Sequence, residues 1–418
     1  MSGPAASFSR RVLVLASGSS VAQIVPFLIS PILTRIYSPS DFGVYAIFLA
    51  IVGVTSVLAT GRYELAIVIA NDRESATRVA ALTIVLATAF STCLLALSLL
   101  VLLVPSRIDW VDELGLWLLL VPICTLVMGI SQALVYYAIH LHSYRSVAQA
   151  SVYRSLAGAA VQVAIGLAVK SSAGLILGTL VSYVASSGRL WRPFRRNWAT
   201  ADIDRQTLAA AARRYSAFPR LSLPGAFANV AAYSLISMGV SALYSAATLG
   251  MYSLVQRVLS APTQLVGAAI GQVFLRAGVD EVSSTGGLRR LYDRTLLRVA
   301  LLSLPPFVGV LLFGDSVFGL VFGDQWTSAG TYAQALAPLS WIAFVAAPLS
   351  NTANVQERQG ISMLWQFGLL VLSIACVISA WVFDLAPESF FWLMSAVLGP
   401  YYGFMVVLYR RLAGRKTL

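Results

Sequence analysis

The amino-acid sequence predicts an all-α membrane protein with twelve transmembrane helices, arranged as two six-helix lobes related by an axis along the membrane normal. Composition is the first observation behind this prediction, because 58% of the residues are hydrophobic and only 11% are charged. The second is that apolar runs long enough to cross a hydrocarbon layer of about 30 Å as helices recur along the whole chain. The third is a turn motif that occurs once in each half and indicates two like-oriented lobes.

The apolar runs define twelve predicted spans. Their centres fall near residues 23, 54, 91, 126, 160, 180, 233, 260, 305, 340, 371 and 398. An even number of spans places both termini on one side of the membrane. Basic residues select the cytoplasm, because Lys and Arg beside the spans hold their loops on that side. Of the 29 basic residues, only Arg35, Arg107 and Lys170 fall on predicted outer segments, and Arg257 lies within a span.

The repeated turn joins the first span to the second, and again the seventh span to the eighth. At one constant offset, the residues Tyr37, Ser38, Gly43 and Tyr45 match Tyr244, Ser245, Gly250 and Tyr252. Each half has an even number of predicted spans, so the two copies enter the membrane in the same direction. Two lobes related in this way are typical of alternating-access transporters.

A basic cytoplasmic segment divides the spans six and six. The predicted organisation is an N-terminal lobe over residues 1–190, a linker over 191–219, a C-terminal lobe over 220–410 and a cytoplasmic tail over 411–418. Within the linker, residues 203–215 have helical composition with Asp at the start and Arg at the end, which the helix dipole favours. We expect an interfacial helix there. The net charge of +12 indicates topology and contact with anionic membrane lipids, and no nucleic-acid partner is expected.

One arginine falls in the middle of a predicted span. Counted from Thr248, Arg257 lies about 14 Å below the outer surface, close to the bilayer midplane. A guanidinium at that depth costs about 2.5–3.5 kcal/mol unless it faces water, a partner or a ligand. Gln256 and Gln264 add polar groups to the same helix. These residues predict a hydrated cationic cavity between the lobes.

A second charged pair, Arg62 and Glu64, lies near the inner end of the second span. If the helix continued through them, two positions would separate their side chains by about 200°, and they could not readily pair. One is then expected to face the cavity. The alternative is that Arg62 extends to the cytoplasmic interface and Glu64 pairs with another arginine.

Further candidates for the cavity lie nearer the ends of their spans. Arg35, Arg154 and Arg220 either line the cavity or act as interface anchors. Pro26 and Pro31 interrupt the first span twice and predict a hinge. Guanidinium groups match phosphate oxygens in pairs, so a phosphate or pyrophosphate is the simplest headgroup for such a cavity.

Motifs for other chemistries are absent from the sequence. It has no phosphate loop for ATP hydrolysis, no catalytic constellation of Ser, His and a carboxylate, and no expected metal site or cofactor. Transport would be driven by an ion gradient, the membrane potential or consumption of the cargo. Glu64 is the candidate for coupling to H⁺ or Na⁺, because it is the acid that lies within a predicted span.

Several phrases resemble one known family. The stretches GRYELAIVIA, LGMYSLVQRVLSAPTQLVGAAIGQVF, LFGDQW and NVQERQG are similar to those of bacterial Wzx-type polysaccharide repeat-unit flippases. These flippases form the polysaccharide transport branch of the multidrug, oligosaccharidyl-lipid and polysaccharide (MOP) exporter superfamily. The resemblance implies a MOP-type fold and no enzymatic activity. It also implies a cationic cavity lined by the first two helices of each lobe, where Arg35, Arg62, Glu64, Gln256 and Arg257 fall.

The resemblance also implies the cargo and the location. Undecaprenyl-pyrophosphate-linked oligosaccharides would be moved from the inner to the outer leaflet of the bacterial plasma membrane, for lipopolysaccharide, capsule or exopolysaccharide synthesis. Candidate partners are a polysaccharide polymerase and the chain-length machinery.

Three alternatives remain open at this point. A cation-coupled multidrug exporter of the same superfamily would prefer buried carboxylates to arginines. A polysaccharide polymerase or ligase would need a substantial outer loop, whereas the longest predicted outer segment runs only from Pro105 to Leu114. A flippase for the peptidoglycan precursor typically has fourteen spans.

Overall fold

Helices are the only secondary structure in the residues that the computed structural model describes, which are 22–103, 109–198, 202–285, 287–356 and 358–414. Within these ranges, eleven helices are long and apolar enough to cross a membrane, and the shorter apolar helix Ala22–Ile36 precedes them. Each predicted span centre falls within one of these helices. The prediction of an all-α, multi-pass membrane protein is therefore confirmed. Arg107 and residues 415–418 lie outside the described residues.

The chain divides into two compact units. Unit 1 comprises Val44–Val230 together with the described residues up to Tyr37, and unit 2 comprises Ser38–Gly43 and the chain from Ala231 onward. The first turn of one long helix therefore belongs to unit 2, whereas the rest of that helix belongs to unit 1.

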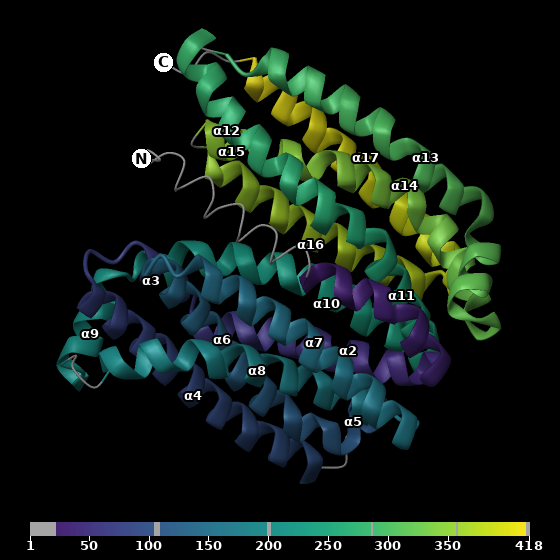
Figure 1. Ribbon diagram of the computed structural model, residues 1–418. Helices are drawn as coiled ribbons and strands as arrows, with labels where there is room; N and C mark the ends of the chain where they lie inside the picture. The colour runs from purple at the N-terminus through teal and green to yellow at the C-terminus, as the bar shows by residue number, and fades with distance from the viewer. Residues whose placement is uncertain (1–21, 104–108, 199–201, 286, 357, 415–418) are drawn as a thin grey trace. The chain divides into compact units, whose positions relative to one another are not determined.

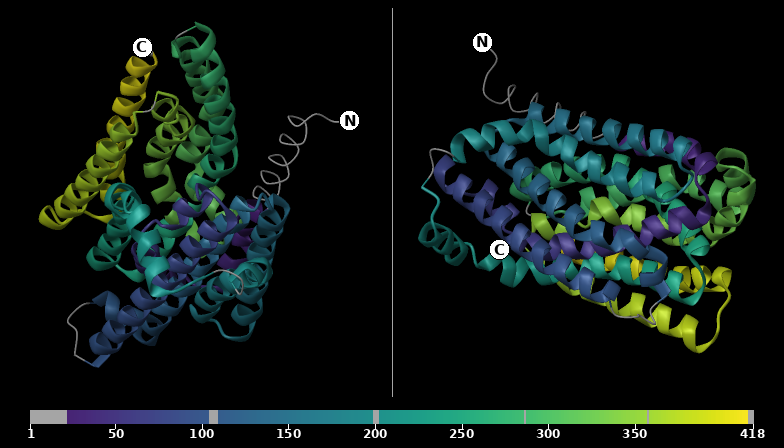
Figure 2. Two further views of the ribbon diagram at one scale, coloured as in Figure 1. Left: turned by 90° about the vertical axis from the view of Figure 1, so that its left-hand side faces the viewer. Right: turned by 90° about the horizontal axis from the view of Figure 1, so that it is seen from below.

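Unit 1 is a bundle of long helices with short helices at its ends (Figures 1 and 2). Its elements are α2 (Pro39–Thr60), α3 (Glu64–Val68), α4 (Arg73–Leu103), α5 (Asp109–Leu114), a 3₁₀ turn (Gly115–Leu119), α6 (Leu120–His140), α7 (Tyr144–Ala168), α8 (Ala173–Trp198) and α9 (Arg205–Arg214). Paired hydroxyls hold α2 against its neighbours. Thr55 lies 2.7 Å from Thr125 of α6, and Tyr45 lies 2.7 Å from Thr179 of α8.

Unit 2 contains the second set of long helices (Figure 1). Helix α10 (Leu223–Leu243) passes from unit 1 into unit 2 at Ala231, and the π-helical turn before it (Phe218–Ser222) belongs to unit 1. The other elements of unit 2 are α11 (Ala246–Pro262), a second π-helical turn (Thr263–Gly267), α12 (Ala268–Thr285), α13 (Arg289–Phe322), a 3₁₀ turn (Asp324–Trp326), α14 (Thr327–Leu349), α15 (Thr352–Val355), α16 (Gln359–Val382) and α17 (Pro387–Ala413). Helix α14 packs against α11, α13 and α17.

The repeated turn motif starts a helix in each half by the same means. Asp41 N–H donates to Ser38 Oγ at 3.2 Å at the start of α2, and Thr248 N–H donates to Ser245 Oγ at 3.1 Å at the start of α11. A serine in this position satisfies an otherwise unpaired donor of the first turn. Both serines of the repeat are therefore helix caps.

The tyrosine that precedes each serine fastens its turn. Tyr37 O–H donates to the Gln162 carbonyl at 2.6 Å, and Tyr244 O–H donates to the Leu385 carbonyl at 2.8 Å. Each acceptor lies at or near the last two long helices of the same half. The repeat thus preserves a tertiary contact as well as a turn.

The repeated glycines pack the two turns against each other within unit 2. A Cβ on Gly43 would overlap the carbonyl of Ala246, and a Cβ on Gly250 would overlap the carbonyl of Pro39. Each repeated glycine therefore allows the backbone of the other copy to approach closely, as small residues do at helix crossings in membranes.

Candidate functional site

The chain turns sharply where α2 ends. Gly61 and Arg62 follow Thr60 with φ values of 56° and 62°, and α3 begins at Glu64. This left-handed conformation suits glycine but strains an arginine by roughly 1–2 kcal/mol. The sequence predicted helical spacing through this stretch, and that prediction is wrong because two successive left-handed residues end the helix.

Arg62 and Glu64 form an ion pair in this turn. Arg62 Nη1 lies 3.3 Å from Glu64 Oε1, and the Glu64 side chain is only 1% exposed. The expectation that the two cannot pair is therefore also wrong, because the 200° separation holds only on a regular helix.

The ion pair leaves buried polar atoms without partners. Arg62 Nε and Glu64 Oε2 are both buried, and neither makes a hydrogen bond with any residue that the structure describes. An unpaired buried polar group costs about 1–3 kcal/mol, and more when it is charged. The turn thus holds one unused hydrogen-bond donor and one unused acceptor, which suits the binding of a polar group or an ion.

Tyr63 connects this turn to the linker that the sequence predicts to be cytoplasmic. Its hydroxyl donates to the carbonyl of Ala212 in α9 at 3.1 Å. Burial raises the pKa of the Tyr63 hydroxyl, and the positive charge of Arg220 partly offsets that effect. Tyr63 therefore stays a neutral donor at physiological pH, and Arg220 lies within electrostatic range of the turn.

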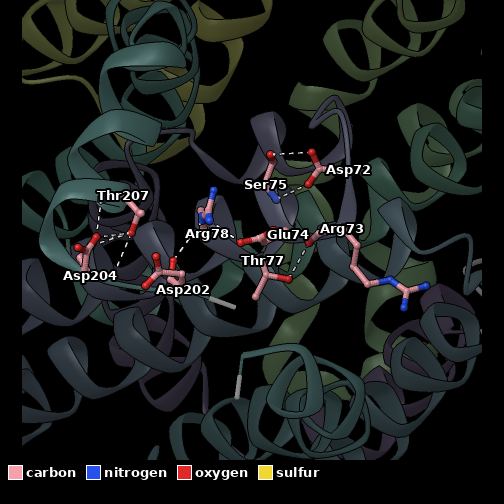
Figure 3. A network of polar contacts seen from close by, with 9 residues as sticks. All are labelled: Asp72, Arg73, Glu74, Ser75, Thr77, Arg78, Asp202, Asp204 and Thr207. Atoms are coloured by element: carbon pink, nitrogen blue, oxygen red, sulfur yellow. Dashed lines mark hydrogen bonds and ion pairs between the residues drawn. The ribbon is translucent and has the colours of Figure 1, made fainter. Parts of the chain in front are cut away.

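Helix α9 docks on the start of α4 through a polar network (Figure 3). Asp204 caps α9 by accepting from Thr207 N–H at 2.7 Å, and Asp204 N–H donates to Thr207 Oγ1 at 2.9 Å. Arg78 of α4 donates from Nε to the Asp202 carbonyl at 3.2 Å and pairs with Glu74. The predicted helix over 203–215 is present as α9, and it packs on unit 1.

Lowering the pH should release the caps of α4 and α9. Hydrogen bonds from the Ser75 and Thr207 backbones hold the pKa of Asp72 and of Asp204 below the ordinary value of 3.8. The two aspartate caps therefore stabilise their helices fully above about pH 5, and this contribution is lost as the pH falls through 3.8 and below.

Hydrogen exchange, corrected for intrinsic rates, should show α9 losing protection between about pH 5 and pH 3. Asp204→Asn is the matched control, because asparagine caps equally well without titrating. Equal loss of protection in both proteins would contradict a titrating cap.

Few features of the sequence indicate this arrangement. Gly61 followed by a charged residue was the one turn signal in an otherwise apolar run. The contribution of Tyr63 was missed altogether, because its partner in α9 lies far along the chain.

Other predicted residues of unit 1 lie away from this turn. Arg35 is exposed at the end of helix Ala22–Ile36 and donates to the Pro31 carbonyl at 3.0 Å. Helix α2, whose 22 residues extend about 33 Å, separates Arg35 from Arg62. One phosphate therefore cannot touch both arginines at once. The helix continues through Pro26 and Pro31, and their role as a hinge stays a prediction.

Arg154 is exposed on α7 and lies over an aromatic ring. Its guanidinium carbon is 5.0 Å from the ring centroid of Tyr183 on α8. This cation–π contact accounts for its place in the fold without a ligand.

Arg257 and Gln256 belong to unit 2. Gln256 donates to the Tyr252 hydroxyl at 2.6 Å, and the Arg257 guanidinium carbon lies 5.8 Å from the ring centroid of Phe42. Arg257 is half-buried and comes eleven residues after Ala246, about 16 Å along the helix. In the described part of the chain it forms no ion pair with a carboxylate.

No metal centre is found in the described ranges, where no group of three or more His, Cys, Asp and Glu side chains could hold an ion.

The sequence model of the family described as "Polysaccharide biosynthesis protein" matches residues 32–331. The chain belongs to this family. The resemblance to the polysaccharide branch of the exporter superfamily is therefore confirmed. A curated relative of this polysaccharide biosynthesis protein is the teichuronic acid biosynthesis protein TuaB of Bacillus subtilis (strain 168), 21% identical over 202 residues. The match covers 47% of this chain and 41% of TuaB, so the chain aligns with less than half of that relative.

Solved structures establish the fold of this polysaccharide biosynthesis protein. The lipid II flippase MurJ in an inward closed conformation gives a TM-score of 0.65 at 11% identity, over 96% of this chain and 86% of MurJ. An inward-facing MATE-family multidrug resistance transporter of the MOP superfamily gives 0.61 at 14% identity, over 96% and 94%. The predicted MOP-type fold is thus confirmed, and at these identities the likeness concerns the fold alone.

Proposed function

We propose that this polysaccharide biosynthesis protein moves undecaprenyl-pyrophosphate-linked oligosaccharide repeat units from the inner to the outer leaflet of the bacterial plasma membrane. Membership in the family, together with a fold shared with transporters, supports this function. The observation that carries the proposal is the half-buried Arg62, which is held in a strained conformation while its Nε–H has no partner among the described residues.

Strain at Arg62 indicates a role beyond folding. Residues kept in costly conformations cluster at binding sites, where the surrounding structure holds them in place. A guanidinium with free donors binds phosphate oxygens in pairs. In the proposed mechanism, Arg62 takes the pyrophosphate at the cytoplasmic end of α2, and Arg257 is a second anion contact deeper in the membrane. The polyprenyl chain stays in lipid.

Alternating access would complete the cycle. The lobes would open to the cytoplasm to admit the headgroup and then to the outer side to release it. Glu64 is the proposed coupling residue, because it is buried beside Arg62 and has one carboxylate oxygen without a partner. Binding of a proton or Na⁺ there would weaken the hold of Glu64 on Arg62 and free the guanidinium for the cargo.

Deletion of the gene tests the function directly. We expect lipid-linked repeat units to accumulate on the cytoplasmic face and surface polysaccharide to disappear, as measured by lipid extraction and immunoblotting. Single repeat units attached outside without polymer would instead indicate a polymerase. An unchanged polysaccharide together with increased drug sensitivity would favour a multidrug exporter.

The Glu64→Gln variant tests the coupling. Because glutamine cannot take up a proton, export should become independent of pH, whereas wild-type export should change with the pH on the two sides of the membrane. The measurement is the rate at which labelled lipid-linked glycan reaches the outer leaflet of proteoliposomes across a pH series. An unchanged pH profile in the variant would remove Glu64 from the coupling step.

A further inference from the structure

Unit 2 contains a group of four aromatic side chains that the proposed function does not use. They are Tyr233 of α10, Trp365 of α16, and Tyr401 and Tyr402 of α17, and we name them the aromatic cluster. Trp365 and Tyr401 stack in parallel with centroids 4.1 Å apart, and Tyr402 meets Trp365 edge-on at 4.9 Å. The Tyr233 and Tyr402 hydroxyls are 3.3 Å apart.

Part of the aromatic cluster is fixed by the fold. Tyr401 O–H donates to the Trp365 carbonyl at 3.0 Å, and its ring occupies space that a Cβ on Gly368 would fill. This stacked pair therefore has a sufficient explanation in helix packing. Helix packing does not explain the hydroxyls of Tyr233 and Tyr402 in the same way.

Tyr233 presents an accessible ring and an incompletely used hydroxyl. Its side chain is 48% exposed, which is high for a tyrosine in the middle of a membrane span. In a pair of hydroxyls one donates to the other, so the second proton remains free for another acceptor. The indole N–H of Trp365 likewise has no protein partner among the described residues, and the side chain is only half-buried.

Polar groups on α10 indicate that this side does not face lipid. Asn229, Tyr233 and Ser237 follow one another at intervals of four and share one face of the helix. Ser237 donates to the Tyr233 carbonyl at 3.1 Å, whereas Asn229 and Tyr233 have unused hydrogen-bonding groups that would find no partner in hydrocarbon. The face that carries Tyr233 therefore suits a polar ligand.

The depth of the cluster matches cargo that arrives from the cytoplasm. Tyr402 lies eight residues before Arg410, about 12 Å along α17, and Trp365 lies seven residues after Arg358, about 10 Å along α16. Both basic residues belong to segments predicted to be cytoplasmic. A headgroup entering from that side would meet the cluster within the inner half of the span.

We infer that the aromatic cluster is a sugar-binding subsite, in which Tyr233 and Trp365 bind a pyranose ring of the lipid-linked glycan. A pyranose presents C–H groups on its face, which pack on aromatic rings, and hydroxyls at its edge, which pair with the free tyrosine and indole donors. This inference rests on the proposed function and adds to it a residue-level contact for the glycan.

Two probe lipids separate the subsite from the phosphate contact. One is undecaprenyl diphosphate, and the other is the lipid-linked repeat unit extracted from the host strain that lacks this gene. Binding of each radiolabelled lipid is measured with the full chain in nanodiscs. The wild type should bind the glycan-bearing lipid more tightly than the bare diphosphate.

Tyr233→Phe should weaken binding of the glycan-bearing lipid about fivefold, as loss of one neutral hydrogen bond does, and leave undecaprenyl diphosphate unaffected. Trp365→Leu should weaken it further. Trp381→Leu is the matched control, because Trp381 is on the same helix α16 and is 71% exposed without belonging to the cluster. If Trp365→Leu fails to fold, Tyr233→Phe decides alone.

Unchanged binding of the glycan-bearing lipid to a folded Tyr233→Phe protein would overturn the inference and leave the cluster a packing feature. Equal affinity of the wild type for both lipids would overturn it too, while the flippase proposal stands. Failure of the wild type to bind either lipid would defeat the flippase proposal itself.

Discussion

The double variant Arg62→Gly/Glu64→Gln is expected to fold as stably as the wild type and to export no lipid-linked glycan. Glycine removes the strain at a φ of 62°, which is worth about 1 kcal/mol. Glutamine removes the buried charge that would otherwise be left unpaired. Cargo binding loses a charge-assisted contact, which amounts to roughly ten- to hundredfold in affinity.

Arg62→Gly alone should behave differently. Orphaning the buried Glu64 carboxylate costs about 3–5 kcal/mol, more than the relief of strain returns. The single variant should therefore unfold more easily, and adding Glu64→Gln should restore the melting temperature without restoring export. Thermal unfolding of the purified protein and immunoblots of surface polysaccharide measure the two effects separately.

An exposed ion pair in unit 2 provides the matched control. Arg410 Nε lies 2.7 Å from Asp293 Oδ1, and both side chains are partly exposed. Arg410→Gln/Asp293→Asn removes a comparable pair where no cargo contact is proposed, so export should continue. If that variant abolished export as fully as the Arg62 variant does, loss of any ion pair would be enough to stop export. The proposed cargo contact at Arg62 would then be unsupported.

Alanine at either repeated glycine should destabilise the protein by about 1–3 kcal/mol or more. The added methyl group would overlap a main-chain carbonyl, of Ala246 in the case of Gly43 and of Pro39 in the case of Gly250. Backbone atoms cannot rotate away as a side chain can. The melting temperatures of the two variants report the effect.

The double variant Gly43→Ala/Gly250→Ala should lose less stability than the sum of the two single variants. The first added methyl group already pushes the two turns apart, so the second meets less overlap. Gly53→Ala is the control on the same helix α2, since its nearest neighbour is a Val230 methyl at 3.4 Å. That change should be neutral or mildly stabilising, because alanine favours the helix. A fall in melting temperature for Gly53→Ala as large as that for Gly43→Ala would show that any methyl group added to α2 destabilises the protein.

Hydrophobicity was sufficient to predict the long helices, because a span is defined by its own residues. Helix α9 was predicted for a similar reason, since the acid at its start and the arginines at its end are local signals. The turn at Gly61 and Arg62 was not predicted, because arginine rarely adopts positive φ and the apolar run continues beyond it.

Contacts between distant residues could not be predicted from composition. The bond from Tyr63 to Ala212 and the stacking of Trp365 on Tyr401 each depend on how separate helices pack. Arg257 shows the opposite case, because its position deep in the span is predicted by counting along its own helix and stays a prediction. What the guanidinium of Arg257 approaches depends on residues far away in the sequence, such as Phe42.

The assignment of Ser38–Gly43 to unit 2 means that the two halves of the gene do not encode two self-sufficient domains. A fragment ending before α10 would carry a helix whose first turn has lost its binding surface, and a fragment beginning at α10 would lack six residues that complete its fold. The two copies of the turn therefore depend on each other, and a split protein would need both pieces made together.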